Sequence, residues 1–288
     1  MNTIKTLCKY ALLGLLFIGS SCQDVVEIDT PSEDSRLIID ALFRIDVDQP
    51  STKLVVKVSE TNGFFETIPP ANLMQITISN LDNPLPDATV FLEEEPGSGI
   101  YVKTLETSIL LQDRWFLQID FGNEYYVAEA SFVPAVPIES LVQGDEILFN
   151  DDDVEVEVTY TDIPDQENYY IFDFGSGEYL ATEDTFYQGQ EFEFSYFYDG
   201  EEVLPGDEVT VSILGANFDF YTYMNQLVEQ SEEAGNPFQT PTLTVRGNFI
   251  NATTIDNELV FNNVESAGNF ALGYFALVQE YKKSLVIE

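Results

Sequence analysis

Cys22 is the residue whose type and surroundings point most directly to chemistry. It ends a short apolar segment that begins at Ala11, follows Lys5 and Lys9, and closes with the small residues Gly19–Ser21. A charged start, an apolar stretch of roughly ten residues and small residues before the cut are typical of a secretion signal. The stretch is too short to span a bilayer comfortably. The layout predicts a lipoprotein signal that ends at a lipid-attachment cysteine.

We therefore expect residues 1–21 to be removed as a lipoprotein signal peptide and the thiol of Cys22 to receive a diacylglycerol group. Each buried CH2 contributes about 0.8 kcal/mol, so two or more acyl chains, such as palmitate, anchor a protein stably where one chain is marginal. The alternative is an ordinary cleaved signal in which Cys22 has no role. Residues 22–35 are acidic and partly apolar, and we expect them to form a tether.

Carboxylates are the second group of residues with possible chemistry. The chain has 51 Asp and Glu against 11 Lys and Arg, a formal net charge of −40, which excludes nucleic-acid binding and favours cations or basic partner surfaces. Clustered carboxylates can bind calcium, which takes about six to eight oxygen ligands. The weak candidates are Asp151, Asp152 and Asp153, with further acidic loops at Glu155, Glu157, Glu93–Glu95, Glu201, Glu202, Asp207 and Glu208. None has the spacing of an EF-hand, so a solvated acidic surface is the alternative and no metal or other cofactor is predicted.

Histidine is absent from the chain. This removes the usual general base and excludes Ser-His-Asp chemistry, Cys-His chemistry and zinc bound by histidine. A glycosidase needs only two opposed carboxylates, and Asp207 with Glu208, or Asp151 with Asp153, would supply such a pair. With 51 acidic residues such pairs are inevitable. We therefore predict that the protein is not an enzyme.

Aromatic residues are the third group that could bind a ligand. The chain contains 22 Phe and 15 Tyr. Six tyrosines in its second half could form a stacking platform for sugars or for a partner: Tyr169, Tyr170, Tyr179, Tyr187, Tyr196 and Tyr198. The alternative is core and cross-strand packing in an aromatic-rich β-sheet.

Alternation of apolar and polar residues predicts that β-strands position these groups. In the first half of the chain, runs separated by Gly, Pro and Asn turns predict strands at 37–43, 53–58, 75–78, 88–92, 115–121 and 125–130. About seven strands over some 100 residues are typical of an immunoglobulin-like β-sandwich. We assign this sandwich to residues 36–133.

Pro134 and Pro137 favour an extended, stiff path and place a domain boundary near Pro134. Beyond it, residues 134–288 are predicted to form a second β-rich domain, with strands at 154–158, 169–174, 192–197, 208–214 and 272–278. This domain carries one helix near 219–233. Its predicted apolar face is Tyr221, Met224, Leu227 and Val228. The predicted fold class is all-β.

Four stretches of the sequence together resemble a known protein family. They are Cys22–Asp29 leading into Arg36–Asp40, the turn Pro96–Tyr101, the segment Gly235–Phe238, and the closing pair Gly247–Ile250 and Gly268–Phe275. In this order and spacing they are similar to the Bacteroidetes lipoproteins grouped as domain of unknown function 4249 (DUF4249). The resemblance implies a surface-exposed lipoprotein of the outer membrane that accompanies a TonB-dependent receptor, and it brings no catalytic residue.

The functional expectation combines these observations. We predict a non-enzymatic, lipid-anchored outer-membrane protein that is accessory to a TonB-dependent receptor and helps to capture or admit its ligand. The alternative is a surface lipoprotein that binds a glycan or calcium directly, through the tyrosines or acidic loops of residues 134–288. The residues that would contact the receptor are not predicted.

Overall fold

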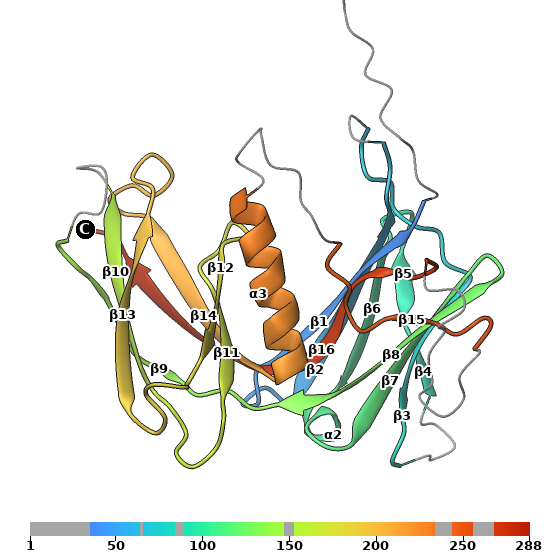
Figure 1. Ribbon diagram of the computed structural model, residues 1–288, viewed down its shortest axis with the longest axis horizontal. Helices are drawn as coiled ribbons and strands as arrows, with labels where there is room; N and C mark the ends of the chain where they lie inside the picture. The colour runs from blue at the N-terminus through green and yellow to red at the C-terminus, as the bar shows by residue number, and fades with distance from the viewer. Residues whose placement is uncertain (1–34, 64–65, 84–88, 147–152, 234–243, 256–267) are drawn as a thin grey trace, which may run out of the picture. The chain divides into compact units, whose positions relative to one another are not determined.

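β-strands make up about half of the described residues, and many of them have one buried and one solvated face (Figure 1). The computed structural model describes residues 35–63, 66–83, 89–146, 153–233, 244–255 and 268–288. Ser35–Asn62 and Glu66–Glu288 belong to one unit by their contacts. Cys22, Asp151, Asp152 and the segment Gly235–Phe238 lie outside the described residues, as do the predicted signal peptide and nearly all of the tether.

The first β-sandwich consists of two sheets that enclose a common core and are joined at one edge, where Leu277 and Val278 lie opposite Phe132 and Val133 in parallel register. One sheet has the order β5-β6-β2-β1-β16, from β5 (Glu93–Glu95), β6 (Ile100–Glu106), β2 (Ser51–Glu60), β1 (Leu37–Ile45) and β16 (Leu272–Val286). The other has the order β4-β3-β7-β8-β15, from β4 (Thr89–Phe91), β3 (Gln75–Asn80), β7 (Arg114–Phe121), β8 (Glu124–Val133) and β15 (Ile250–Asn251). Side chains of both sheets fill the core, among them Ile39, Phe43, Leu117 and Phe275.

The second β-sandwich is built in the same way. One sheet has the order β12-β11-β14-β16, from β12 (Tyr179–Glu183), β11 (Tyr169–Asp173), β14 (Glu208–Ala216) and the end of β16. The opposing sheet has the order β13-β10-β9, from β13 (Glu191–Tyr198), β10 (Val154–Thr161) and β9 (Ile138–Gln143). Aromatic rings dominate the core between them, with Tyr160 in contact with Tyr170, Phe172, Tyr187 and Phe192.

The 15-residue strand β16 belongs to both sandwiches. Its first part runs parallel to β1, from Leu272 opposite Ile38 to Gln279 opposite Ile45. Its second part runs antiparallel to β14, from Glu280 opposite Leu214 onward. The all-β fold class is therefore confirmed. The predicted boundary near Pro134 coincides with the end of β8, but β16 comes from the predicted second domain and completes the first sandwich.

Two of the segments that carry the family resemblance explain how β16 is held. Gly273 has φ +103°, and a Cβ atom there would lie 1.8 Å from the carbonyl oxygen of Ile39. Asn248 fixes the same strand because its side-chain amide donates to Phe275 O and accepts from Phe275 N, both at 2.8 Å. These residues are scaffold: they allow close approach and satisfy backbone groups.

The main helix, α3 (Phe218–Glu233), agrees with the predicted range. Asn217 begins it, since its side-chain oxygen accepts from Phe220 N at 2.9 Å. Phe220 and Met224 are buried against β11, β14 and β16, whereas Leu227, predicted to lie on the apolar face, is exposed. The other described helix is the short α2 (Thr107–Leu110), which was not predicted. Neither of these helices is long and apolar enough to cross a membrane.

Candidate functional site

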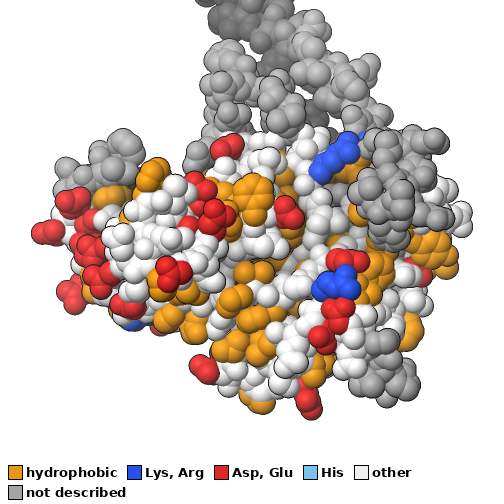
Figure 2. Space-filling view, turned by 60° about the horizontal axis from the view of Figure 1, so that its bottom comes forward, with side chains coloured by type: hydrophobic (Ala, Val, Ile, Leu, Met, Phe, Trp, Pro, Cys, Tyr) orange, Lys and Arg blue, Asp and Glu red, His pale blue; other side chains and the backbone are white. Residues whose placement is uncertain are grey.

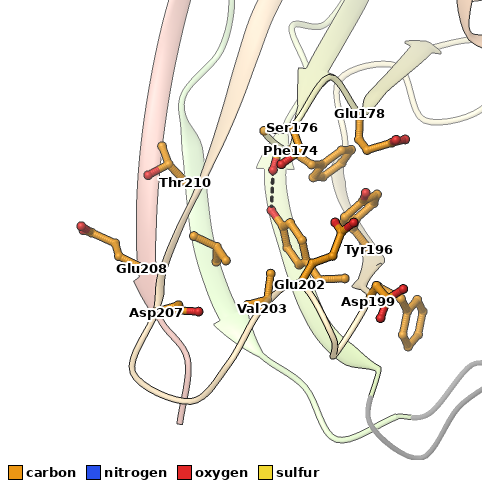
Figure 3. Close-up of a pocket in the computed structure, with 14 residues that line it drawn as sticks. Phe174, Ser176, Glu178, Tyr196, Asp199, Glu202, Val203, Asp207, Glu208 and Thr210 are labelled. Atoms are coloured by element: carbon orange, nitrogen blue, oxygen red, sulfur yellow. Dashed lines mark hydrogen bonds between the residues drawn. The ribbon is translucent and has the colours of Figure 1, made fainter.

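An open cavity of about 720 Å³ lies in the second sandwich, where the end of β11, the end of β13 and the start of β14 meet (Figure 3). Its walls come from the turn at 174–178, the last residues of β13, and the loop at 199–207 that leads into β14. The two sheets of the sandwich therefore both contribute to it. Acidic side chains gather on the left of Figure 2, the side on which Figure 1 places the second sandwich.

Aromatic rings form one wall of the cavity. Strand alternation turns Tyr196 and Tyr198 of β13 to the same side, and the ring of Tyr196 stacks on Phe174, with centroids 3.7 Å apart and planes at 2°. Tyr198 meets Tyr196 edge-on at 4.8 Å and donates its hydroxyl to Phe174 O at 3.0 Å, the dashed line in Figure 3. Burial raises the pKa of both tyrosines. Both rings therefore stay neutral around pH 7.

Five carboxylates surround this aromatic wall, all on exposed residues: Glu178, Asp199, Glu202, Asp207 and Glu208. Asp199 and Asp207 shape the loop, because they accept from Glu201 N at 2.8 Å and from Leu204 N at 2.9 Å. Burial is the main cause of the raised pKa of Tyr196, and the charges of Glu178 and Glu202 add to it. Both glutamates line the cavity with Tyr196. Glu208 points away from the cavity in Figure 3. No lysine or arginine is among the described lining residues.

The arrangement suits binding better than bond breaking. The Asp207 and Glu208 side chains diverge, so they are not an opposed pair of the kind a glycosidase uses. The described lining residues include no cysteine or lysine nucleophile. Aromatic faces and nearby carboxylates instead favour contacts with sugars or with cations.

Of the predicted calcium candidates Asp151, Asp152 and Asp153, only Asp153 lies among the described residues. Asp153 is half-buried at the start of β10, while its neighbours Asp151 and Asp152 are not described. Glu155 is buried and accepts from Ser195 Oγ at 2.5 Å and from Glu146 N at 2.7 Å, which makes it a structural acceptor. In the described part of the chain, no group of three or more Asp, Glu or Cys side chains is placed to hold a metal ion.

The remaining loop candidates have other contacts. Glu93 and Glu95 on β5 pair with Lys103 at 3.6 Å and with Lys53 at 3.4 Å. Burial raises the pKa of Glu157, and the neighbouring charges of Glu155 and Glu193 add to this. Like charges crowded on one surface favour any cation that neutralises them, but they do not by themselves form a coordination shell.

The structure divides the six predicted platform tyrosines between two places. Tyr170 is buried in the core of the second sandwich with Tyr187, Tyr196 and Tyr198 packed against it, and Tyr169 and Tyr179 pack on the other face of β11, toward α3. Only Tyr196 and Tyr198 line the cavity. The platform is therefore smaller than predicted, because alternate residues of a strand face opposite sides of its sheet.

A buried carboxyl pair in the second sandwich was missed by sequence reasoning. Asp162 accepts from Tyr170 Oη at 2.7 Å and from Gly189 N at 2.8 Å, and Asp184 accepts from Asn168 N at 3.0 Å. Burial raises the pKa of Asp184, and the neighbouring Asp162 raises it further. The two acids are 22 positions apart on different elements, and neither lines the cavity. Their contacts are those of structural acceptors.

The fold and the site thus define an all-β protein of two sandwiches with an open cavity lined by aromatic rings and carboxylates. The model of the family described as "Domain of unknown function (DUF4249)" matches residues 23–284. The chain belongs to this family, as its sequence motifs predicted. No curated protein matches the chain.

Two solved structures are similar to the chain only remotely. One is a DUF4785 family protein from Legionella pneumophila, with 11% identity and a TM-score of 0.22, covering 62% of this chain and 52% of that one. The other comes from work on host cell surface retention of a 1.5-MDa bacterial ice-binding adhesin, with 12% identity and a TM-score of 0.20, covering 66% and 61%. This chain therefore spans less than two thirds of either structure, and neither carries an argument about its function.

Proposed function

We propose that this chain is a non-enzymatic Bacteroidetes lipoprotein of the outer membrane, anchored through Cys22 and exposed at the cell surface. In this proposal it is accessory to a TonB-dependent receptor and helps to capture the ligand. The observation that carries the proposal is the N-terminal layout: a charged start, an apolar run and small residues end at Cys22, and the family match begins at the next residue, 23.

The second sandwich supports a role in ligand capture. Its cavity is open to solvent and offers aromatic rings and carboxylates, which is the chemistry of a binding site. The whole sequence lacks histidine, and the lining carboxylates Asp207 and Glu208 diverge. Binding without catalysis is consistent with an accessory that passes a ligand on unchanged.

Crosslinking in intact cells tests the proposal. The native protein carrying an affinity tag is crosslinked, captured under denaturing conditions, and its partners are identified by mass spectrometry. We expect a TonB-dependent receptor to be enriched at least about tenfold over the Cys22→Ala variant, which cannot receive the acyl chains that hold it at the membrane. Recovery of no outer-membrane protein above that background would overturn the receptor role.

Direct glycan binding is the second candidate, and the stack of Tyr196 on Phe174 favours it, because sugars present apolar faces to aromatic rings and hydroxyls to carboxylates. Calcium binding by Asp151, Asp152 and Asp153 has no support among the described residues. Calorimetric titration of the intact protein with a panel of neutral glycans and with calcium decides both. Flat titrations throughout would remove this candidate.

A further inference from the structure

Five carboxylates and no lysine or arginine are among the described residues that line the cavity of the second sandwich. Glu178 and Glu202 line it together with Tyr196 (Figure 3). Among the described residues, Arg44, Lys53, Lys103, Arg114 and Lys282 form ion pairs away from the cavity. These carboxylates would repel an anionic occupant, whereas a cation would be drawn to them.

The aromatic wall narrows the kind of cation. An ammonium or guanidinium group within about 6 Å of an aromatic centroid is attracted by the negative face of the ring. The partly exposed rings of Tyr196 and Tyr198 line the cavity, and the buried Phe174 stacks on Tyr196. A bare metal ion gains little from such rings and needs several converging oxygens, which the described residues do not provide. An organic cation uses both the rings and the charges.

The size of the cavity sets the scale of the ligand. Pockets that hold small molecules have volumes of about 300–1,000 Å³, and this one has about 720 Å³. A single methylammonium group would fill a small part of it. The space suits a cationic group carried on a larger apolar or peptide body.

The geometry points to a binding site for an organic cation, a guanidinium or alkylammonium group on a small molecule or a peptide, held by Glu178 and Glu202 against the ring of Tyr196. The cation-binding site is inferred from the cavity alone. The interpretation that this cation belongs to the ligand that the protein captures for a receptor rests on the proposed function. The carboxylates supply attraction and the rings supply selectivity for a weakly hydrated cation.

Calorimetric titration of the intact lipoprotein in a neutral detergent tests the site with matched probes. The small-molecule arm compares benzyltrimethylammonium with benzyl alcohol, and the peptide arm compares tetra-arginine with tetra-citrulline, its neutral isostere. We expect the cationic member of at least one pair to bind and its neutral counterpart not to bind. The affinity should fall at least about fivefold between 50 and 500 mM NaCl, since exposed charges are screened.

Variants identify the residues responsible. The double variant Glu178→Gln/Glu202→Gln should weaken binding at least about fivefold. The matched control Glu183→Gln/Glu201→Gln removes the same charge from two exposed positions that do not line the cavity, and it should change binding less than about twofold. Tyr196→Phe keeps the ring and should bind normally, whereas Tyr196→Leu should not. Should Tyr196→Leu fail to fold, the comparison of the two double glutamate variants still tests whether the cation binds in the cavity.

Each outcome has a definite meaning. Binding of the small cation alone, or of the peptide alone, supports the site and assigns the source of the cation. Absence of cation binding, equal binding of a neutral probe, or equal loss in both double variants overturns the site. Receptor capture by crosslinking is measured separately, so its failure beside intact cation binding overturns only the accessory role.

Discussion

The ion network at Arg44 makes the sharpest stability prediction. Arg44 on β1 contacts Asp173 on β11 at 2.6 Å and Glu280 on β16 at 3.2 Å, and the side chains are 27%, 14% and 6% exposed. Arg44→Met removes the cation and leaves the carboxylates of Asp173 and Glu280 with little access to water. Burial lowers the pKa of Arg44, but Asp173 and Glu280 raise it by more, so Arg44 stays charged at any pH at which the protein folds.

The magnitude follows from burial. Removing one partner of a buried ion pair costs about 3–5 kcal/mol, because the other charge is left without compensation. Lys282, 3.0 Å from the second oxygen of Glu280, keeps part of the compensation. We therefore expect Arg44→Met to lower the free energy of unfolding by about 2–4 kcal/mol. At about 2–4 °C per kcal/mol for a chain of this size, Tm should fall by about 4–16 °C.

Denaturant and thermal unfolding of the intact protein measure this loss. The matched control is Lys53→Met, because Lys53 pairs with Glu95 at 3.4 Å with side chains 59% and 49% exposed, and it should cost less than about 1 kcal/mol. The triple variant Arg44→Met/Asp173→Asn/Glu280→Gln should recover at least half of the loss, since no buried charge remains without a partner and Lys282, which loses Glu280, is 58% exposed. Equal destabilisation by Arg44→Met and Lys53→Met would refute the reasoning.

Two further predictions concern the scaffold. Gly273→Ala should lower the free energy of unfolding by more than about 3 kcal/mol or prevent folding, because its Cβ would lie 1.8 Å from Ile39 O at a φ of +103°. The control Gly268→Ala has open space around it, so its melting temperature, measured by circular dichroism, should be close to that of the wild type. Burial raises the pKa of Asp184, so the folded protein keeps a proton that the unfolded chain loses above pH of about 3.9. The contribution of protonated Asp184 to the free energy of unfolding is fully present below that pH. It is lost as the pH rises through the pKa of Asp184 in the folded protein, by at most about 1.4 kcal/mol per pH unit. Asp184→Asn should therefore gain stability relative to the wild type between pH 4.5 and 7, and a difference that does not change with pH would contradict this.

Alternation of residue types predicted the buried strands and the helix because burial itself produces those patterns. The runs at 37–43, 53–58 and 208–214 became β1, β2 and β14. The strands that the pattern missed include β5, whose three glutamates are all exposed at a sheet edge, and β12, whose residues are none of them buried. Hydrogen bonds to a neighbouring strand hold such segments, and that information is not local to them.

The candidate site could be predicted only in part, for a related reason. Tyr196 and Tyr198 follow from the alternation of β13, and Glu202 was noted as part of an acidic loop. Phe174 and Glu178 reach the cavity because β11 pairs with β14, a long-range contact without a local signal. The sequence also did not predict that β16 belongs to both sandwiches. Its second half contains polar residues such as Lys282, so alternation predicted a strand only for its first half.

The central proposal is that this all-β protein is anchored to the membrane through Cys22. The most direct test is the mass of the N-terminal peptide of the mature native protein. Mass spectrometry of the protein from its own membranes should find Cys22 as the first residue, carrying a diacylglycerol group and an acyl chain on its amine. A mature chain with an unmodified N-terminus that partitions into the aqueous phase of a detergent separation would contradict the account.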